Sequence, residues 1–487
     1  MKYYRKLEKL MNKWSLLYGA SMILQWDSRT MIPKRSHLLR SEQISLLSTM
    51  QYEILASDEI IELLNYIDNS ILNDWQKANI REIFRLHNIA KKLPKNIINK
   101  LAKETAKCEK HWRVRTNQYD QEYLEKYFEE VVTLTREMAF LLGDGLGLSA
   151  YDVLLEQQQP GLRDDLIVPI FNQIELFTKD FLSIRKNLVE EKDNWPVIPV
   201  NQQIKFIKEL MSEMRFDFST GRLDESTHPF TGGISGDIRI CSYFKPDDII
   251  LSISAIMHEM GHASYESRLP KKLRGQPVSD SRGMCFHEGI ALFFEKQIGH
   301  SKEYLEYLSE ILEKEFGYLK YFNKDNLKNN FNKIKRSGIR VSADDFTYPA
   351  HIIIRYKIEK ELISGNLSVK ELNDRWRYLY NLYLGITPHS YEGPWQDIHW
   401  AIGLFGYFPC YLIGGVISAQ LFNKAQKEIL IKKEISQGKF NKIQKWLGEK
   451  IYSKGSYFDF EDLIISSCGQ SLSANDFINN LVERLNQ

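Results

Sequence analysis

The stretch MHEMGHASYE (Met257–Glu266) places two histidines four residues apart around a glutamate. Residues four apart lie on one face of a helix, so His258 and His262 can direct two imidazoles at one metal ion. Glu259 lies one step round the helix, where its carboxylate can reach a water molecule held by that metal. The HExxH pattern therefore predicts a zinc site with Glu259 as general base; a pair of purely structural histidines is the alternative.

A third ligand is expected from a second helix. The segment Ser281–Gly299 is amphipathic and offers Glu288, twenty-six residues after the second histidine. Two histidines and one glutamate leave the fourth position of a tetrahedral ion to water, as catalytic zinc requires. His287 points about 100° away on the same helix, so we expect it to support a ligand or to pack. Glu266 and Glu295 are expected to be solvated or supporting groups.

The elements that must position these residues are mostly helical. Apolar residues recur at helical spacing through most of the chain, and the region around the HExxH motif reads as an uninterrupted helix. The clearest strand is Gly236–Phe244, which follows a glycine-rich turn at His228–Gly236. We therefore expect a mainly α protein with one small β-sheet beside the HExxH helix. That arrangement suits a peptidase, because an edge strand can hold an extended peptide by backbone hydrogen bonds.

Two prolines in Asn194–Val200 interrupt the helical pattern. This segment is the best candidate for a boundary between an N-terminal helical lobe, about residues 1–195, and a catalytic lobe, about residues 196–487. Length alone would permit about three domains.

Composition argues against several other classes of protein. The net charge is +2, and the most basic stretch, Ile431–Lys450, is interrupted by glutamates and apolar residues. That pattern favours a solvated helix face over a nucleic-acid patch. The uncharged segment Trp400–Asn423 has the length of a membrane span, but its glycines and central proline favour a buried, irregular core segment. We therefore expect neither nucleic-acid nor membrane binding.

The five cysteines are scattered and form no CxxC pair, which indicates a reducing compartment. The N-terminal stretch MKYYRKLEKLMNKW carries charges where a signal peptide needs its apolar core. Both observations predict a cytoplasmic protein.

The chain resembles the HExxH metallocarboxypeptidases typified by carboxypeptidase Taq. The resemblance extends beyond the metal motif and runs in order through nearly the whole chain. The matching stretches are LQWDSRTMIPKRSHLLRSEQISLLS (Leu24–Ser48), YDVLLEQQQPG (Tyr151–Gly161), HPF (His228–Phe230), DIRIC (Asp237–Cys241), IRVSAD (Ile339–Asp344), HIIIRYKIEKELISG (His351–Gly365), GPWQDIHW (Gly393–Trp400) and GYFPCY (Gly406–Tyr411).

Two positions depart from the family pattern. Cys241 replaces the threonine of DxRxT, which removes one hydroxyl near the strand. In HEGI, which replaces the family's HESQ, Gly289 and Ile290 follow Glu288. These departures leave the metal ligands in place but alter the groups that surround them.

The resemblance implies a single peptidase domain over residues 1–487 with a deep active-site groove, and a homodimer. It implies a carboxypeptidase of broad specificity acting on peptides with a free C-terminal carboxylate, with one Zn²⁺ per chain. Co²⁺ or Mn²⁺ are possible substitutes, because sites of this type accept several divalent ions. The segment that carries His399, Tyr407 and Tyr411 is expected to line the cleft and to supply a donor to the oxyanion.

A carboxypeptidase must also recognise the terminal carboxylate, and the planar fork of arginine suits that task. The resemblance points to Arg340, with Arg355 and Arg336 as alternatives. Asp344 and Asp397 are expected to orient their neighbours.

Asp237 and Arg239 are further candidates for contacting substrate. An ion pair between the two on the predicted strand is the competing interpretation.

Two other functions remain open. An oligopeptidase that cleaves internally would share the HExxH motif and the spacing to the third ligand. A helical binding protein with an impaired site is a third possibility, suggested by the HEGI departure.

Overall fold

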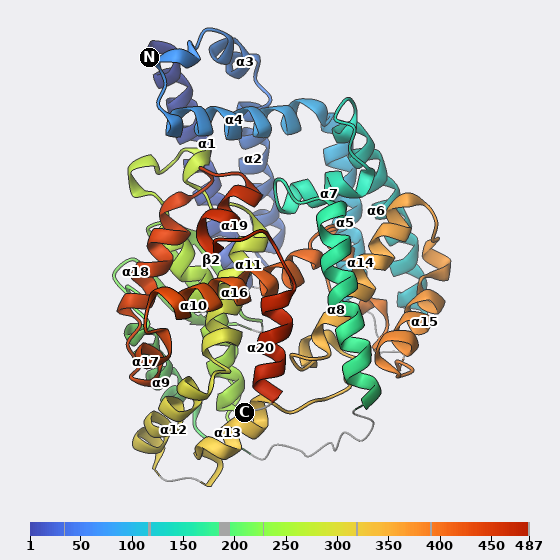
Figure 1. The fold of residues 1–487 in the computed structure, drawn as a ribbon. Helices are drawn as coiled ribbons and strands as arrows, with labels where there is room; N and C mark the ends of the chain where they lie inside the picture. The colour runs from blue at the N-terminus through green and yellow to red at the C-terminus, as the bar shows by residue number, and fades with distance from the viewer. Residues whose placement is uncertain are drawn as a thin grey trace.

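The computed structural model describes residues 1–33, 35–114, 118–184, 195–226, 228–317, 320–389 and 392–485, and helices dominate them (Figure 1). The expected mainly α fold with one small sheet is confirmed. The helices before the sheet are α1 (Lys2–Thr30), α2 (His37–Leu55), α3 (Asp58–Asn65), α4 (Asp74–Lys92), α5 (Lys95–Val114), α6 (Gln118–Gly143), α7 (Ala150–Gln158), α8 (Asp164–Ile184) and α9 (Val200–Glu213).

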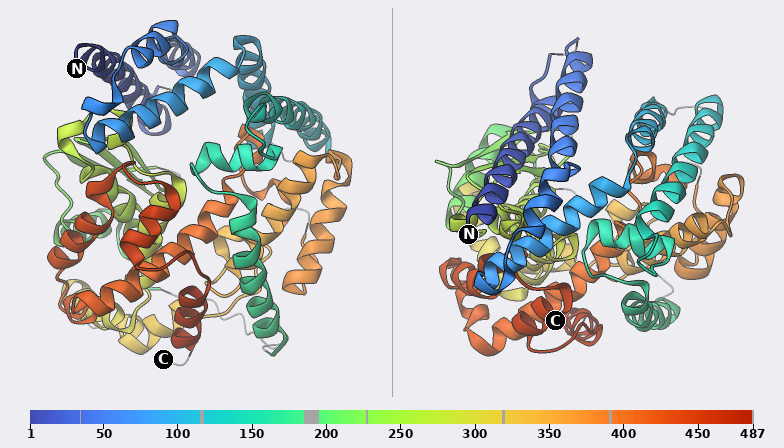
Figure 2. Two further views of the ribbon diagram at one scale, coloured as in Figure 1. Left: turned by 45° about the horizontal axis from the view of Figure 1, so that its top comes forward. Right: turned by 90° about the horizontal axis from the view of Figure 1, so that it is seen from above.

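Two of these pairs, α1 with α2 and α5 with α6, are long helical hairpins that stand out on the same side of the molecule (Figure 2, right). The sheet and the helices after it form the larger part of the core. These elements are β1 (Gly221–Glu225), β2 (Phe230–Ile234), β3 (Asp237–Ser242), α10 (Ile249–Ser267), α11 (Met284–Leu292), the π-helix η4 (Phe293–Ile298), α12 (Lys302–Phe316), α13 (Lys324–Phe331), α14 (Tyr348–Ser364), α15 (Leu372–Leu384), α16 (Phe408–Glu428), α17 (Ile431–Ser436), α18 (Asn441–Lys450), α19 (Phe460–Cys468) and α20 (Asn475–Leu485).

The sheet has the strand order β1-β3-β2, with β3 parallel to β1 and antiparallel to β2. The predicted strand is confirmed as β3, but the prediction of a glycine-rich turn before it was wrong over Phe230–Ile234, which forms β2. Consequently β3 is the central strand and not an edge, so the exposed edges belong to its two neighbours. Gly233, near the end of β2, has φ +91°, and a Cβ there would lie 1.9 Å from the carbonyl oxygen of Asp237.

Helix α10 begins where the side chain of Asp248 accepts a hydrogen bond from the backbone N–H of Leu251, 3.0 Å away. Its buried face includes Ile253 and Met257. Gly261 on this helix brings α11 unusually close, because a Cβ there would lie only 2.4 Å from the Cα of Ala291.

The uncharged segment Trp400–Asn423 is mostly buried, as expected, and it is irregular up to Tyr407. From Phe408 it forms the regular helix α16, because Pro409 falls in the first turn, where its missing N–H is not needed. Within the described ranges, every helix is too short or too polar to cross a membrane.

The predicted lobe boundary at Asn194–Val200 begins outside the described residues, and the division into lobes stays a prediction. Buried contacts nevertheless join the two regions. Arg282, just before α11, donates to Glu82 of α4 over 2.8 Å, and both side chains are almost fully buried.

A buried carboxylate anchors the segment that leads into α16. Glu359 of α14 accepts hydrogen bonds from the Trp400 indole (2.8 Å), the Tyr151 hydroxyl (2.8 Å) and the backbone N–H of Gly406 (3.1 Å). Burial raises the pKa of Glu359 to about 7, although these three donors favour the ionised form. The network therefore fixes three distant parts of the chain around one acceptor.

Replacing Glu359 with leucine should leave three buried donors without an acceptor. Since each orphaned group costs about 1–3 kcal/mol, we expect Glu359→Leu to lower the free energy of unfolding by about 3 kcal/mol or more. Urea denaturation followed by circular dichroism measures this change. Glu359→Gln keeps one acceptor oxygen but turns an NH2 group toward at least one of these donors, so it should cost about 1–3 kcal/mol, less than Glu359→Leu. Equal stability of Glu359→Leu and the unchanged protein would contradict the anchoring role.

Candidate metal centre

The structure brings the three predicted metal ligands together. His258 Nε2 lies 3.1 Å from His262 Nε2 and 3.9 Å from Glu288 Oε1. The distance from His262 Nε2 to Glu288 Oε2 is 3.8 Å. The histidines come from successive turns of α10 and the glutamate from α11. Within the described residues, no other group of three histidine, cysteine or acidic side chains approaches so closely.

These donors fit a zinc ion. Ligand atoms bonded tetrahedrally at about 2.1 Å would lie about 3.4 Å from one another, which falls inside the observed range of 3.1–3.9 Å. Two imidazole nitrogens and one carboxylate oxygen are also the ligand types that catalytic zinc prefers. Glu288 is only 4% exposed, so its charge needs a cationic partner in this position.

The charges of the site act strongly on one another. Burial opposes protonation of His258, but Glu288 and Glu295 outweigh it and raise the pKa of His258 to about 10. Burial, with the neighbouring histidines, lowers the pKa of His262 well below its usual value. The two carboxylates therefore attract positive charge to His258, and a metal ion that binds there must displace a proton.

A series of ion pairs begins at Nδ1 of His258, the ring nitrogen that does not face the other two ligands. This nitrogen lies 2.8 Å from Glu295 Oε2, and the other oxygen of Glu295 lies 2.7 Å from Lys296 Nζ. Lys296 lies 3.0 Å from Asp345, which also pairs with Arg484 of α20. Glu295 and Lys296 belong to the π-helix η4, a rare wide turn that occurs frequently at functional sites. Glu295 is thus a supporting group, as expected.

The predicted general base, Glu259, is buried and held in one orientation. Thr231 of β2 donates a hydrogen bond to Glu259 Oε2 over 2.7 Å and lies 3.1 Å from the Glu259 backbone carbonyl. Burial raises the pKa of Glu259, while His258 and Thr231 oppose the rise. A raised pKa suits a carboxylate that must take up and release a proton.

His287 packs against the site and is not one of the clustered ligands. Its ring stacks on that of His262, with centroids 4.5 Å apart, and its Nε2 lies 2.9 Å from Glu266 Oε1. Both expectations for this histidine, support and packing, describe its contacts.

Among the three candidate arginines, Arg340 alone lines a cavity together with His258 and Glu288. Asp397 accepts from Arg340 Nε (2.9 Å) and Nη2 (2.8 Å), and the Tyr348 hydroxyl lies 3.3 Å from Nη1. Asp397 therefore orients the guanidinium, as the sequence predicts.

The other two arginines are engaged elsewhere. Arg355 is buried against Asp397 and the backbone carbonyl of His351, and Arg336 donates to the backbone carbonyl of Leu182. Asp344 accepts the backbone N–H groups of Phe346 and Thr347, so it orients the start of α14.

The candidate donors His399, Tyr407 and Tyr411 form one cluster. His399 Nε2 lies 3.1 Å from the Tyr411 hydroxyl, and the rings of Tyr407 and Tyr411 are 5.2 Å apart. Burial lowers the pKa of His399 to about 3 and raises the pKa of both tyrosines well above 10, so all three are neutral. Of the three, Tyr411 lines the cavity of the metal ligands.

Asp237 and Arg239 bond to each other rather than to groups of the metal site. Arg239 Nε and Nη2 lie 2.9 and 3.0 Å from the two carboxylate oxygens of Asp237. The guanidinium also stacks over Trp26 of α1 at 4.3 Å. These contacts favour the ion-pair interpretation over direct contact with substrate.

The HEGI departure lies on faces of α11 that contact the core. A Cβ at Gly289 would lie 3.2 Å from the carbonyl oxygen of Gly414, and Ile290 is completely buried. The two substitutions therefore fit the packing of α11 against its neighbours and leave the carboxylate of Glu288 directed at the histidines. The HEGI departure therefore gives no reason to interpret the site as impaired.

Sequence reasoning missed two residues of the site, Thr231 and Tyr348. The first lies in a stretch interpreted as a turn, and the second is the first residue of α14 and belongs to no motif. Their roles follow only from the packing of β2 against α10 and of α14 against Arg340.

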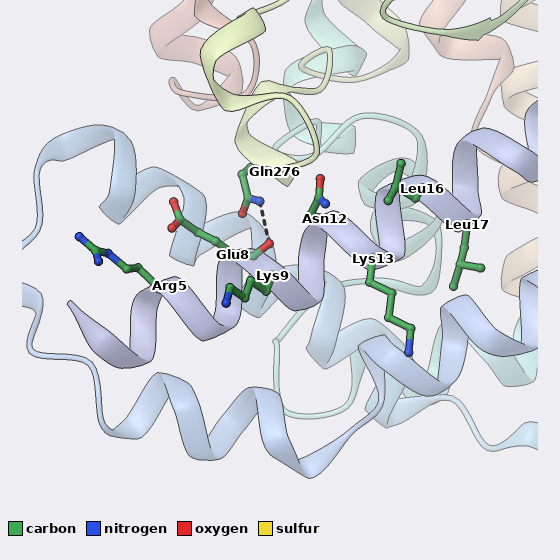
Figure 3. Close-up of a pocket in the computed structure, with 8 residues that line it drawn as sticks. All are labelled: Arg5, Glu8, Lys9, Asn12, Lys13, Leu16, Leu17 and Gln276. Carbon is green, nitrogen blue, oxygen red and sulfur yellow. Dashed lines mark hydrogen bonds between the residues drawn. The ribbon is translucent and has the colours of Figure 1, made fainter.

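A larger hollow of about 790 Å³ lies along α1, away from all the predicted site residues (Figure 3). Its walls come from exposed side chains such as Arg5, Lys9 and Lys13, and from Gln276, which donates to the backbone carbonyl of Glu8. It has no cluster of ligating groups, so the metal centre remains the candidate active site.

Comparison with known proteins agrees with this geometry. The family model described as carboxypeptidase Taq (M32) metallopeptidase matches residues 6–485. Thermostable carboxypeptidase 1 of Thermus thermophilus is 31% identical over 98% of this chain and 96% of its own length. Carboxypeptidase 1 of Bacillus subtilis is 31% identical over 99% of this chain and 98% of its own.

Among solved structures, Trypanosoma cruzi metallocarboxypeptidase 1 superposes with a TM-score of 0.94 at 29% identity, covering 100% of both chains. Fold, motif order and ligand geometry lead to the same assignment. The chain belongs to the carboxypeptidase Taq (M32) family of metallopeptidases and is a metallocarboxypeptidase.

Proposed function

We propose that this enzyme removes single residues from the free C-terminus of peptides, with broad specificity, using one zinc ion held by His258, His262 and Glu288. The observation that carries the proposal is a single cavity lined by two of these ligands and by Arg340. A metal ligand set and a carboxylate-binding group thus face the same space. An enzyme that cuts only the last peptide bond needs this arrangement.

A bound zinc ion would supply a Lewis acid and lower the pKa of a water molecule toward neutrality. Glu259 takes the proton of the attacking water and delivers it to the leaving amine. The hydrogen bond from Thr231 holds the carboxylate in the orientation that both transfers require. Tyr411, held by His399, presents a hydroxyl at the cavity wall and is our candidate donor to the oxyanion, with Tyr407 beside it.

Arg340 and Tyr348 are the groups that we assign to the terminal carboxylate of the substrate. Asp397 occupies one side of the guanidinium and so fixes its plane before substrate arrives. Preorganisation of this kind reduces the entropy lost on binding. Asp237 and Arg239 take no part in this mechanism, and we assign their ion pair a role in the stability of the sheet.

Two broader properties are also proposed. All five cysteines are unpaired and buried, which suits a protein of the reducing cytoplasm.

Exposed leucines at positions 16, 38, 39 and 46 give the α1–α2 hairpin an apolar surface that suits burial in a homodimer. Light scattering of the purified protein measures its mass in solution.

Metal content tests the ligand assignment. The unchanged protein should contain about one zinc per chain, and Glu288→Ala should retain less than about a tenth of it, because two imidazoles alone bind weakly. Mass spectrometry of metals in dialysed protein measures both values. Glu310→Ala, at an exposed position on α12, is the control and should match the unchanged protein. Equal zinc in Glu288→Ala and the control would refute the assignment.

The state of the substrate's C-terminus tests the reaction. A peptide with a free carboxylate should lose residues one by one, whereas its amide should react about 30-fold more slowly or worse, because Arg340 loses its charged partner. Arg340→Met should remove most of this difference by slowing cleavage of the free peptide. Mass spectrometry of timed samples measures both. Internal fragments, formed equally from both peptides, would establish an oligopeptidase instead.

The support given by Glu295 should appear as metal affinity. Removing a carboxylate that orients a ligating histidine typically weakens metal binding by about 10–100-fold, so we expect this loss in Glu295→Ala. Glu295→Gln retains an oxygen that can accept from His258 and should lose less. Competition with a chromophoric chelator measures the zinc dissociation constants. Unchanged affinity in Glu295→Ala would show that His258 needs no such partner.

A further inference from the structure

A cavity of about 300 Å³ opens beside the metal ligands and extends between α11, α16 and α20. Its lining includes His258, Glu288 and Arg340. It also includes Phe477 and Leu481 of α20, a helix that begins almost two hundred residues after the metal glutamate and packs on α16 (Figure 1). The proposed mechanism uses the first three residues and leaves the two α20 residues without a role.

Much of the cavity lining is apolar. Leu292, Val341 and Leu412 add to the surface begun by the two α20 residues. The polar side chains of Gln297 and Ser418 also line the cavity and are hydrogen-bonded to each other over 3.2 Å. Gly415 of α16 lets Phe477 approach, since a Cβ there would lie 3.1 Å from its ring. The ring of Phe477 therefore forms a wall whose position depends on the close contact between α16 and α20.

The charged side chains that line the cavity are already paired with protein groups. Lys296 lies between Glu295 (2.7 Å) and Asp345 (3.0 Å), and Asp345 also pairs with Arg484. A charged substrate side chain that entered would lose its hydration and would have to compete for a partner already engaged.

We propose that this cavity receives the side chain of the substrate's C-terminal residue, and that α20 gives the broad specificity of the enzyme a preference for apolar over charged residues. The inference rests on the proposed function, because Arg340 must hold the terminal carboxylate for the adjoining side chain to enter. The volume equals about ten water molecules' share of the liquid, which accommodates a leucine or phenylalanine side chain.

Peptides that differ only in their last residue test this inference. With the zinc-loaded enzyme, kcat/KM for peptides ending in leucine or phenylalanine should exceed that for peptides ending in glutamate or lysine by at least about tenfold. Release of the terminal amino acid is measured by mass spectrometry. Equal values for apolar and charged residues would overturn the inference, while release of residues one at a time would still support the carboxypeptidase. Failure to release any residue would instead refute the proposed function.

Two variants test the wall itself. Phe477→Ala should lower kcat/KM for a leucine-ended peptide by about tenfold, while a peptide ending in alanine, which does not reach the wall, should react as before. Val482→Ala is the matched control, since Val482 lies on the same helix, is 40% exposed and does not line the cavity. A loss in Phe477→Ala that is equal for both peptides would overturn the role of α20.

Val341→Lys keeps the inference testable if Phe477→Ala does not fold, because Val341 is 75% exposed at the cavity wall. An added ammonium group should raise kcat/KM for a glutamate-ended peptide relative to a leucine-ended one by about tenfold. An unchanged ratio would show that terminal side chains do not enter this cavity.

Discussion

The close contact between α10 and α11 is the constraint on which the active site depends. With glycine at position 261, the backbones of the two helices approach until the space for a Cβ is gone. This close separation allows two imidazoles on one helix and the carboxylate of Glu288 on the other to bind a single ion. A second glycine contact, between Gly289 and Gly414, fixes α11 against α16 in the same way. The metal ligands thus owe their geometry to backbone packing.

Polar groups then set the orientation that packing leaves free. A histidine ring can rotate about its bonds, and the carboxylate of Glu295 restricts that rotation for His258. Thr231 does the same for Glu259, and Asp397 for Arg340. Each reactive side chain therefore has its own partner, and these partners come from β2, the π-helix and the segment before α16. The site is assembled from regions that are distant in sequence.

Local sequence patterns predicted the parts of the site that depend on local structure. The spacing of His258 and His262 follows from helical periodicity, and Glu288 could be found because one helix returns beside another. The strand β3 was visible from its alternation. In contrast, β2 contains two consecutive glycines and was taken for a turn, since the pairing that makes it a strand is supplied by its neighbour. Thr231 was lost with it.

The remaining gaps have a similar cause. Tyr348 carries no motif, and its contact with Arg340 exists only in the folded chain. The pairing of Asp237 with Arg239 was one of two interpretations left open, since residues two apart share one face of a strand. The stacking of Arg239 on Trp26, which favours that pairing, exists only in the folded chain. Nothing in the pattern of residues 475–485 connects that helix with the metal ligands. Tertiary contacts between remote segments decide all three cases.

The distance along the chain between Glu288 and the residues of α20 has a consequence for biosynthesis. A ribosome adds about 5–20 residues per second, so the wall formed by Phe477 and Leu481 emerges about 10–40 s after the metal ligands. Until then the nascent chain lacks the α20 wall of this cavity. If α20 acts as proposed, discrimination among terminal residues requires a chain that is almost complete.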